Sequence, residues 1–502
     1  MRQGIGVSSA GSLPTSGPSS GKKPKESRRW LNPRVPKEQL YRLSPRRPKP
    51  KRLGRLERWD RIRRVIRTWW IWLAVAIGAH LAGMWILSLI AGALAFIFYH
   101  TSPASHPAVY ALETDLDVES PEFPITMAGM TGMPLLPGNQ VALFNNGDEF
   151  FPEMLQAVES AEHSITMEQY IFWDGKVGQR FAEAFAEKAR SGVPVKLLLD
   201  AIGSSILGEP VLKILEAGGC QLAWFRSIHW YTIIRANHRN HRKSLIVDGK
   251  IAFTGGAGLA DHWLGKAKNA RSWRDIMVRV EGPAALVQQS GFAQNWLQST
   301  GEILTGRDYF PVPSPAGDVD VQTIVSSPFE GTGAAGTMHL IALQCARRHV
   351  YIANPYFIPD ARLIDMLARA CQRGVAVKLM VAGHHNDTWW ARQNSVRLYG
   401  KLLQAGVEIF EFLPTMLHQK TVIVDDAWAS VGTANFDNRS MALNEETSNV
   451  LLRPLAGTQP ARCLSSRLRA VSQGALGRLE AARLLAARGR AVRLSDRRSN
   501  VA

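Results

Sequence analysis

Cysteine is scarce in this sequence, because a chain of 502 residues contains only four. The cysteines form no Cys-x-x-Cys pair and have no histidine at metal-ligand spacing, so neither a zinc site nor a disulfide framework is indicated. We interpret them as free thiols that pack as small apolar side chains. The four are Cys220, Cys345, Cys371 and Cys463.

Acidic residues are few at both ends of the chain. Residues 1–67 contain 20 Lys and Arg against 4 Asp and Glu, and residues 457–502 contain 10 Arg against 2 acids. The net charge of +18 therefore lies in the two ends, while residues 68–456 hold 30 basic and 36 acidic side chains. A strongly basic chain is typical of nucleic-acid binding, but a mildly acidic body argues against it. We expect no nucleic-acid partner.

Charged residues are absent from 68 to 99, a stretch rich in Trp, Leu, Ile, Ala and Gly. A bilayer core of about 30 Å requires roughly 20 apolar residues, so the stretch predicts one transmembrane helix over residues 68–100. A tight re-entrant hairpin in the region from Gly78 to Gly83 is the alternative. The apolar run is too long and begins too late for a signal peptide.

The two basic ends have the composition of tails. Residues 1–67 begin with a stretch rich in Gly, Ser, Pro and basic residues, which predicts disorder, and become helix-compatible near the apolar segment. This juxtamembrane cluster predicts a cytoplasmic N-terminus, with the body on the far side of a single span. Residues 457–502 predict either a basic amphipathic helix on a membrane or a solvated tail.

The pattern His-x-Lys, with an Asp five positions after the Lys, occurs twice. The copies are His241, Lys243 and Asp248, and His418, Lys420 and Asp425. One copy arises by chance in about one such chain in a few tens. Both copies, however, have an apolar run before the Asp and a small-residue turn after it, Gly255-Gly256-Ala257 or Gly432-Thr433-Ala434. Strand periodicity places His and Lys on one face, where they can contact the same phosphate.

The repeat extends upstream of the two motifs. Residues 164–174 parallel residues 350–360, and each segment is followed by a helix-period stretch and then by a Gly-Val-x-Val-Lys-Leu sequence. A duplicated α/β unit is the simplest interpretation. We place the first half at residues 101–315 and the second at residues 316–456.

These motifs resemble the phospholipase D superfamily, and the second half is similar to the bacterial cardiolipin synthases. The matching segments are residues 354–360, 416–426, 432–440 and 443–446, and the likeness covers about residues 140–455. The resemblance implies two α/β halves with mixed, helix-flanked sheets around a pseudo-twofold axis, and one active site where the halves meet. It also implies a bacterial inner membrane protein, which we expect to be single-pass.

The resemblance implies phosphodiester exchange through a phosphohistidine. His241 is assigned as the nucleophile and His418 as the acid and base, although the order can be reversed. Lys243 and Lys420 would hold the phosphoryl oxygens, so no metal or other cofactor is required. Because the two histidines start in opposite protonation states, we expect the site to move their pKa values apart and to give a bell-shaped pH profile.

In the family a downstream carboxylate orients each histidine. This residue matches Glu446 in the second half, and Asp275 is the candidate in the first half. The motif residues Asp248 and Asp425 are then interpreted as structural, bracing strand and turn. Asn435 matches the family's phosphate-binding Asn.

Several other groups have competing interpretations. At the position equivalent to Asn435 the first half has Gly258, which removes one phosphate donor. His238 lacks the Lys and Asp spacing and is assigned to the surface or to the surroundings of the site. The sequence His-His-Asn-Asp at 384–387 has poor geometry for a metal, and Glu168 is interpreted as lining the site. The aromatic segment 224–231 either packs in the core or contacts acyl chains.

The leading hypothesis is a membrane-anchored cardiolipin synthase. It would transfer a phosphatidyl group from one phospholipid to the glycerol hydroxyl of phosphatidylglycerol. A phospholipase D hydrolase with water as acceptor has the same motifs, because acceptor choice depends on how the site excludes water. A nuclease is a third hypothesis, weakened by the acidic body and the membrane segment.

Overall fold

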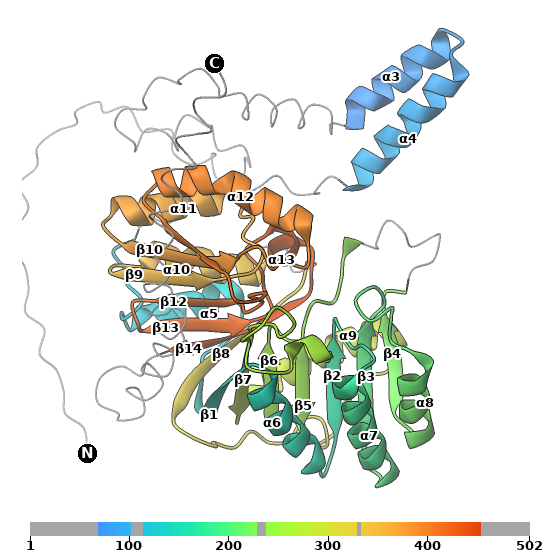
Figure 1. Ribbon diagram of the computed structural model, residues 1–502, viewed down its shortest axis with the longest axis vertical. Helices are drawn as coiled ribbons and strands as arrows, with labels where there is room; N and C mark the ends of the chain where they lie inside the picture. Colours follow the sequence, from blue (N-terminus) through green and yellow to red (C-terminus); the bar gives the residue numbers. More distant parts are fainter. Residues whose placement is uncertain (1–68, 102–113, 228–236, 329–332, 453–502) are drawn as a thin grey trace, which may run out of the picture. The chain divides into compact units, whose positions relative to one another are not determined.

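The computed structural model describes residues 69–101, 114–227, 237–328 and 333–452 (Figure 1). The predictions for residues 1–67 and 457–502, and for Cys463 and the aromatic residues 229–231, fall outside the described residues. The chain divides into two compact units, one ending at His106 and the other beginning at Pro107. Each unit is described separately below.

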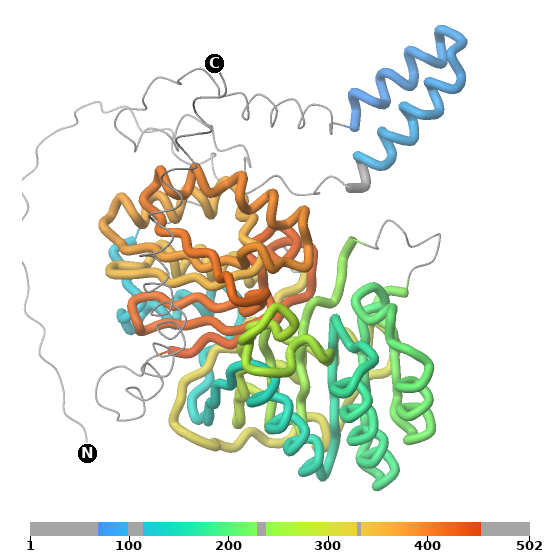
Figure 2. The backbone as a smooth tube through the Cα atoms, in the orientation of Figure 1, coloured from blue at the N-terminus to red at the C-terminus, as the bar shows by residue number. Residues whose placement is uncertain are grey.

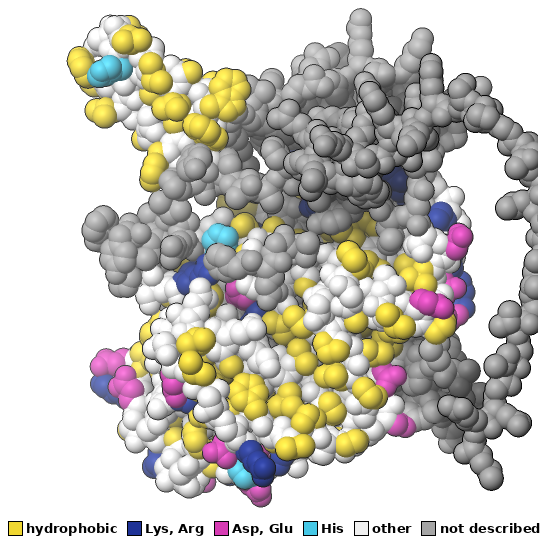
Figure 3. Space-filling model, turned by 180° about the vertical axis from the view of Figure 1, so that it is seen from behind, with side chains coloured by type: hydrophobic (Ala, Val, Ile, Leu, Met, Phe, Trp, Pro, Cys, Tyr) yellow, Lys and Arg dark blue, Asp and Glu magenta, His cyan; other side chains and the backbone are white. Residues whose placement is uncertain are grey.

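The apolar stretch forms a helical hairpin, with helices α3 (Trp69–Leu81) and α4 (Trp85–Thr101). Small side chains let the helices approach closely, because Ala76, Ala79, Ala91 and Ala95 are buried. The outer surface consists mostly of exposed apolar side chains, with His80 also exposed, and Figure 3 shows no Lys, Arg, Asp or Glu on the face in view.

A single helix over 68–100 was the wrong prediction. Gly83 ends α3 with a positive φ of 76°, and the Gly83 and Met84 N–H groups donate to the carbonyls of His80 and Ala79. This is a Schellman ending, which glycine adopts without steric cost. In the described part of the chain, no helix has the length and apolarity needed to cross a membrane.

The body is built on one mixed sheet of 14 strands, in the order β11-β10-β9-β12-β13-β14-β8-β1-β7-β6-β5-β2-β3-β4 (Figure 1). The first half contributes β1 (Leu136–Asn145), β2 (Ile165–Gln169), β3 (Val195–Asp200), β4 (Gln221–Phe225), β5 (Ser244–Val247), β6 (Ile251–Gly255) and β7 (Ile276–Glu281). The second half contributes β8 (Val319–Ser326), β9 (His349–Ala353), β10 (Ala376–Ala382), β11 (Glu408–Phe412), β12 (Thr421–Val424), β13 (Trp428–Gly432) and β14 (Glu446–Leu452).

The strand order is a palindrome about the pairing of β1 with β8. Reading outward from this pair, β7, β6, β5, β2, β3 and β4 match β14, β13, β12, β9, β10 and β11. Parallel pairs β2–β3–β4 and β9–β10–β11 lie at the two ends, and the strands between them are antiparallel. The α/β class and the duplication expected from the repeat are therefore confirmed, with the two halves sharing one continuous sheet.

Helices connect and cover the strands. The first half has α6 (Gly147–Glu159), α7 (Lys176–Arg190), α8 (Glu209–Gly218), the 3-10 turn η2 (Asp261–Trp263) and α9 (Ala285–Thr300). The second half has α10 (Ala334–Cys345), α11 (Ala361–Gln372), α12 (Trp389–Gln404) and α13 (Asn438–Ala442). Parallel strands need such crossovers, and their burial on both faces explains why β2 and β3 are buried throughout.

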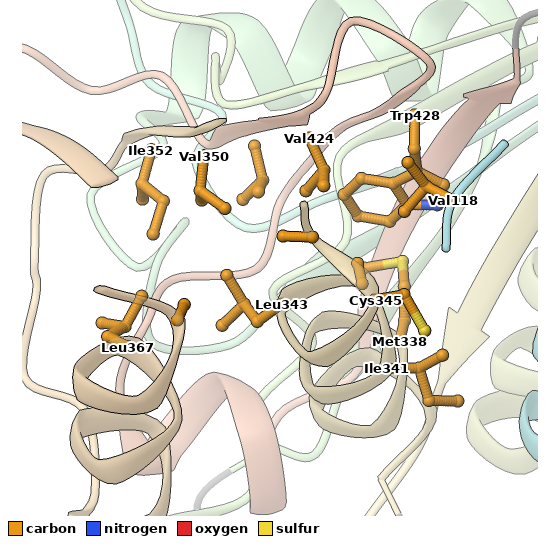
Figure 4. Packing of buried hydrophobic residues seen from close by; sticks show 14 of the residues in the cluster. Val118, Met338, Ile341, Leu343, Cys345, Val350, Ile352, Leu367, Val424 and Trp428 are labelled. Atoms are coloured by element: carbon orange, nitrogen blue, oxygen red, sulfur yellow. The ribbon is translucent and has the colours of Figure 1, made fainter. Parts of the chain in front are cut away.

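Each half has its own apolar core. In the second half, α10 and α11 pack on β9 through residues such as Leu343, Leu367 and Ile352 (Figure 4). Helix α5 (Glu122–Thr131) precedes β1 in sequence, yet Phe123 and Met127 pack into the core of the second half. Figure 2 shows the cyan segment among the orange and red ones. The strand ends between the two cores carry the motif residues.

Candidate active site

The two His-x-Lys motifs enter the sheet from opposite halves and are hydrogen-bonded to each other's half. His241 directly precedes β5, and its N–H donates to the carbonyl of Glu445 at 3.0 Å. His418 precedes β12, and its N–H donates to the carbonyl of Arg274 at 2.7 Å. These contacts belong to the parallel bridges Asn240–Glu445 and Arg274–Leu417. The backbone therefore fixes both motifs at the boundary between the halves.

Each histidine pairs with a carboxylate from the opposite half. The Nδ1 atom of His241 lies 3.0 Å from both oxygens of Glu446, and Nδ1 of His418 lies 3.0 Å from Oδ2 of Asp275. We had expected the reverse assignment, in which each carboxylate serves the histidine of its own half. The bridges explain the exchange, because Glu446 follows the segment bound to the first motif and Asp275 follows the segment bound to the second.

Two further side chains hold these carboxylates, and sequence reasoning missed both. The indole Nε1–H of Trp263 donates to Oδ2 of Asp275 at 2.9 Å, and the Thr433 hydroxyl donates to Glu446. Thr433 was visible as the middle residue of the small-residue turn, but its hydroxyl was not considered. Trp263 lies in η2, and nothing in its local sequence indicates a polar role.

The two lysines are buried beside the histidines. Lys243 donates from Nζ to the carbonyl of His241 at 2.8 Å, and Nζ of Lys420 lies 3.0 Å from Nδ1 of His418. Burial and the charge of Lys420 lower the pKa of Lys243 to about 7. Burial also lowers the pKa of Lys420 to about 8. The two positive charges act on each other, so the two motifs form one electrostatic site.

Both imidazoles have lowered pKa values. Burial is the largest cause for each, and the pKa of His241 falls to about 4, although Glu446 opposes the shift. The charge of Lys420 adds to the lowering of the His418 pKa. Burial and the nearby lysines lower both values, and the separation of the two values stays a prediction. A bound anionic phosphate would raise both values, because it favours the charged imidazole.

The motif aspartates lie at the far ends of strands β5 and β12. The carboxylate of Asp248 accepts hydrogen bonds from the N–H groups of residues 162, 163 and 164, and Asp425 accepts from those of residues 347, 348 and 349. Both have positive φ, 54° and 53°. Each aspartate therefore ties a strand end to the start of β2 or β9, in agreement with the structural role expected.

Asn435 and Gly258 occupy equivalent positions with different surroundings. Asn435 is 5% exposed, and its Oδ1 has no hydrogen-bond partner in the part of the chain described. A Cβ at Gly258 would lie 2.7 Å from Cβ of Ile171, a distance that real contacts do not show. The first half therefore has no space for an Asn at this position.

Aromatic rings flank the two histidines at equivalent positions of the repeat. The ring of Tyr170 lies 5.2 Å from that of His241, and the ring of Tyr356 lies 6.1 Å from that of His418. The Tyr356 hydroxyl donates to Asp387 at 2.6 Å, and burial together with this carboxylate raises its pKa well above the usual value. Asp387 is exposed, so the loop between β10 and α12, which contains it, lies where the site meets solvent.

A buried polar network lies beside His241. Arg242 donates to Oε2 of Glu445 at 2.8 Å and lies 3.9 Å from Glu168, and all three are at most 2% exposed. Glu168 accepts from Asn240 and Asn295, so it supports the first motif without contacting a histidine.

The residues at 384–387 gain no complete set of metal ligands in the part of the chain that the structure describes. The rings of His384 and His385 lie 4.0 Å apart. Over the described residues, no group of three or more His, Cys, Asp and Glu side chains is placed to hold a metal ion.

A family model described as "Cardiolipin synthase, PLD-like domain" matches residues 154–296 and 340–457, more than half of the chain. The chain belongs to this family. The two matched segments correspond to the two halves of the sheet, and the resemblance inferred from the motifs is confirmed.

Individual relatives of the cardiolipin synthase family agree. Cardiolipin synthase 1 of Bacillus cereus is 34% identical over 329 residues, which cover 64% of each chain. Cardiolipin synthase of Geobacillus kaustophilus is 35% identical over 321 residues, covering 63% of this chain and 64% of that one. The match thus spans less than two thirds of these relatives. The crystal structure of phosphatidylserine synthase from Haemophilus influenzae has a TM-score of 0.54 at 13% identity, covering 70% of this chain and 91% of that one, and shows the fold alone.

Proposed function

We propose that this protein is a phosphatidyltransferase of the cardiolipin synthase type. The observation that carries the proposal is the pair of crossed contacts, His241 with Glu446 and His418 with Asp275. Each contact holds Nδ1, so Nε2 of each ring is the atom assigned to the chemistry, and in His418 this atom lies 3.2 Å from Nζ of Lys420. Two oriented imidazoles and two lysines provide a nucleophile, a proton carrier and positive charge for the phosphoryl oxygens.

In the proposed first step, Nε2 of His241 attacks the phosphorus of a donor phospholipid. The P–N bond forms, the P–O bond to the headgroup breaks, and His418 gives its proton to the departing alkoxide. In the second step, His418 takes the proton of a glycerol hydroxyl on phosphatidylglycerol. That oxygen attacks phosphorus, the P–N bond breaks, and His241 is regenerated. With phosphatidylglycerol as donor, the products are cardiolipin and glycerol.

The protonation states support this sequence. Burial keeps His241 neutral at pH 7, because its pKa is about 4, and a nucleophile must be neutral. His418 must be protonated for the first step, and the negative charge of a bound phosphodiester supplies that shift. Near-complete burial of both histidines limits access of water as a competing acceptor.

We propose the bacterial inner membrane as the location, with a cytoplasmic N-terminus. The apolar helical hairpin and the basic sequence before it support this proposal. Phospholipids are then the expected partners, and no metal or other cofactor enters the proposed steps.

The deciding experiment uses purified full-length protein in phosphatidylglycerol vesicles with a chelator present. Cardiolipin and glycerol should form, and the His241→Ala variant should form neither. Phosphatidic acid as the only lipid product would instead identify a phospholipase D hydrolase. Cleavage of single-stranded DNA without lipid turnover would identify a nuclease and overturn the proposal.

A further inference from the structure

Two adjacent tryptophans are exposed on the body. Trp389 is 59% exposed and Trp390 is 73% exposed, and their rings contact each other edge to face with centroids 4.5 Å apart. They begin helix α12, which buries only Ser395 and Leu402 among its 16 residues. Exposing two large aromatic side chains to water is costly, so this placement calls for a partner.

The tryptophans lie beside the candidate active site. They follow Asp387, which accepts the hydroxyl of Tyr356 and whose charge acts on both His418 and Lys420. Arg392 fastens the first turn of α12 to the strand ends, because its Nε donates to the carbonyl of Gly383 at 2.8 Å. The pair is therefore held at the side of the site that is open to solvent.

The first half has exposed apolar side chains at the equivalent place. β3 matches β10 in the palindrome, and the loop after β3 exposes Ile202 by 39% and Ile206 by 61%. This loop is tied to the site, because the Ser204 hydroxyl donates to the carbonyl of Tyr170. Asp200, which begins the loop, accepts the N–H of Asn240 beside the first histidine. Apolar side chains thus occur on both sides of the two motifs.

The charge of α12 indicates the chemistry of the partner. The helix contains Arg392, Arg397 and Lys401 and no acidic residue. Arg397 and Lys401 are exposed. Arg392 is paired with Glu411 at 3.4 Å. A helix with exposed Trp at one end and the exposed Arg397 and Lys401 further along matches an anionic lipid surface, where Trp lies at the headgroup level.

We propose that the loop after β3 and the start of α12 form a docking surface for an anionic phospholipid bilayer. This docking surface consists of Ile202, Ile206, Trp389 and Trp390, with Arg397 and Lys401 as its charged part. Resting on the proposed function, docking would set the two histidines at the depth of the lipid phosphates. A substrate could then reach them with its acyl chains still in the bilayer.

The test compares one lipid in two physical states, with full-length protein. Phosphatidylglycerol is supplied either as long-chain vesicles or as a short-chain form kept below its micelle concentration. We expect Trp389→Ser/Trp390→Ser to lower kcat/KM on vesicles by about tenfold or more, since both large apolar side chains that would enter the bilayer interface are lost. Turnover of the dispersed lipid should change less than about twofold.

A matched control uses exposed apolar residues at the other end of the sheet. Ile303 is 70% exposed and adjoins Glu302, which pairs with Lys196 near the start of β3. Val312 is 75% exposed and adjoins Pro311, which lies against Gly249 in the turn after β5, so both lie at strand ends away from the motifs. Ile303→Ser/Val312→Ser should leave the rates on both lipid forms unchanged. Equal losses on vesicles for the two double variants, or a loss on dispersed lipid as large as on vesicles, would overturn the docking surface.

A second measurement does not depend on turnover. Phosphatidylglycerol brominated in its acyl chains quenches tryptophan that enters the bilayer. Trp389→Phe/Trp390→Phe should reduce the quenched part of the fluorescence relative to the unchanged protein. Equal quenching would overturn the docking surface even if no lipid product forms, whereas reduced quenching without product would contradict only the proposed function. Reduced self-association of the variant without a change in quenching would show that a second copy covers this surface, and would equally overturn the proposal.

Discussion

Glu446 belongs to the second half of the sheet, yet its carboxylate lies 3.0 Å from Nδ1 of His241 in the first half. His418 and Asp275 form the reciprocal contact. Neither half therefore contains a complete histidine–carboxylate pair, although each contains a complete sequence motif. A half expressed alone would present an imidazole without the group that fixes its tautomer.

The first prediction concerns these crossed contacts. Glu446→Gln and Asp275→Asn should each lower kcat by about 10²-fold or more, because an amide cannot stabilise the imidazolium or enforce the tautomer in the same way. Steady-state lipid turnover measures the loss. Glu302→Gln, which removes a largely exposed carboxylate near Lys196, is the control and should retain kcat. Retention of kcat in both site variants would contradict the role assigned to the pairs.

The second prediction decides the order of the histidines. In His418→Ala the acid of the first step and the base of the second are both missing, so His241 should be phosphatidylated more slowly, and a phosphatidyl group that reaches it should stay there. Intact-mass measurement after mixing with phosphatidylglycerol should then show a phosphatidyl adduct, located on His241 by peptide mapping. His241→Ala should show none. If the His241→Ala variant instead carried an adduct on His418, the roles of the two histidines would be reversed.

Much of the fold was readable from the sequence, and the reason is repetition. The duplicated motifs and strand segments predicted two α/β halves, and the palindromic strand order confirms them. The sequence did not predict that Glu446 and Asp275 each pair with the histidine of the opposite half. This pairing depends on which loop of one half forms a bridge with which loop of the other. That information lies in tertiary contacts such as the Asn240–Glu445 bridge. The hairpin was only the alternative to one long helix, because apolar composition does not show whether a Schellman ending at Gly83 breaks the helix.

The site residues divide in the same way. Lys243 and Lys420 followed from the repeated His-x-Lys motif, although both lie just before strands β5 and β12 and not in them. Trp263 became visible only when the fold brought its indole to Asp275. The direction of the histidine pKa shifts was also unreadable, because burial and the partner lysine set it, and neither is a property of local sequence.

The third prediction concerns pH. Lys243 and Lys420 have pKa values of about 7 and about 8 in the folded protein, so their charges are lost as pH rises through this range. KM for anionic lipid should therefore rise above pH 7. Stability, in contrast to lipid binding, should improve over this range. A lysine in the unfolded state has a pKa of about 10.4, so the unfolded state binds more protons than the folded state between pH 7 and 10. The free energy of unfolding therefore increases with pH there.

Lys243→Met provides the control for this pH effect. In this variant the denaturation midpoint should rise less between pH 7 and pH 10 than in the unchanged protein, because one of the two buried lysines that titrate in this range has been removed. Lys243→Arg should remain charged over the whole range, and should still lose activity, since a planar guanidinium does not replace an ammonium. An unchanged pH slope of stability in the Met variant would contradict the assignment.

The fourth prediction separates Asp425 from the chemistry. Asp425→Ala removes an acceptor for three backbone N–H groups and places Ala at a φ of 53°. We expect a loss of about 1–3 kcal/mol in the free energy of unfolding, measured by urea denaturation. The folded fraction should keep kcat within a few-fold. A kcat loss comparable to that of Glu446→Gln, without destabilisation, would place Asp425 in the chemistry instead.

The last prediction concerns the ion pair between Arg242 and Glu445, which joins the halves beside His241. Both residues are at most 2% exposed, so removing Arg242 leaves the buried Glu445 carboxylate without its counter-ion, and removing Glu445 leaves Arg242 with Glu168 at 3.9 Å. Arg242→Met or Glu445→Gln alone should destabilise the protein by about 3–5 kcal/mol. The double variant should be more stable than the sum of the two losses predicts, because neither charge remains. Additive losses in this double-mutant cycle would show that Arg242 acts instead through its bond to the carbonyl of Gly291.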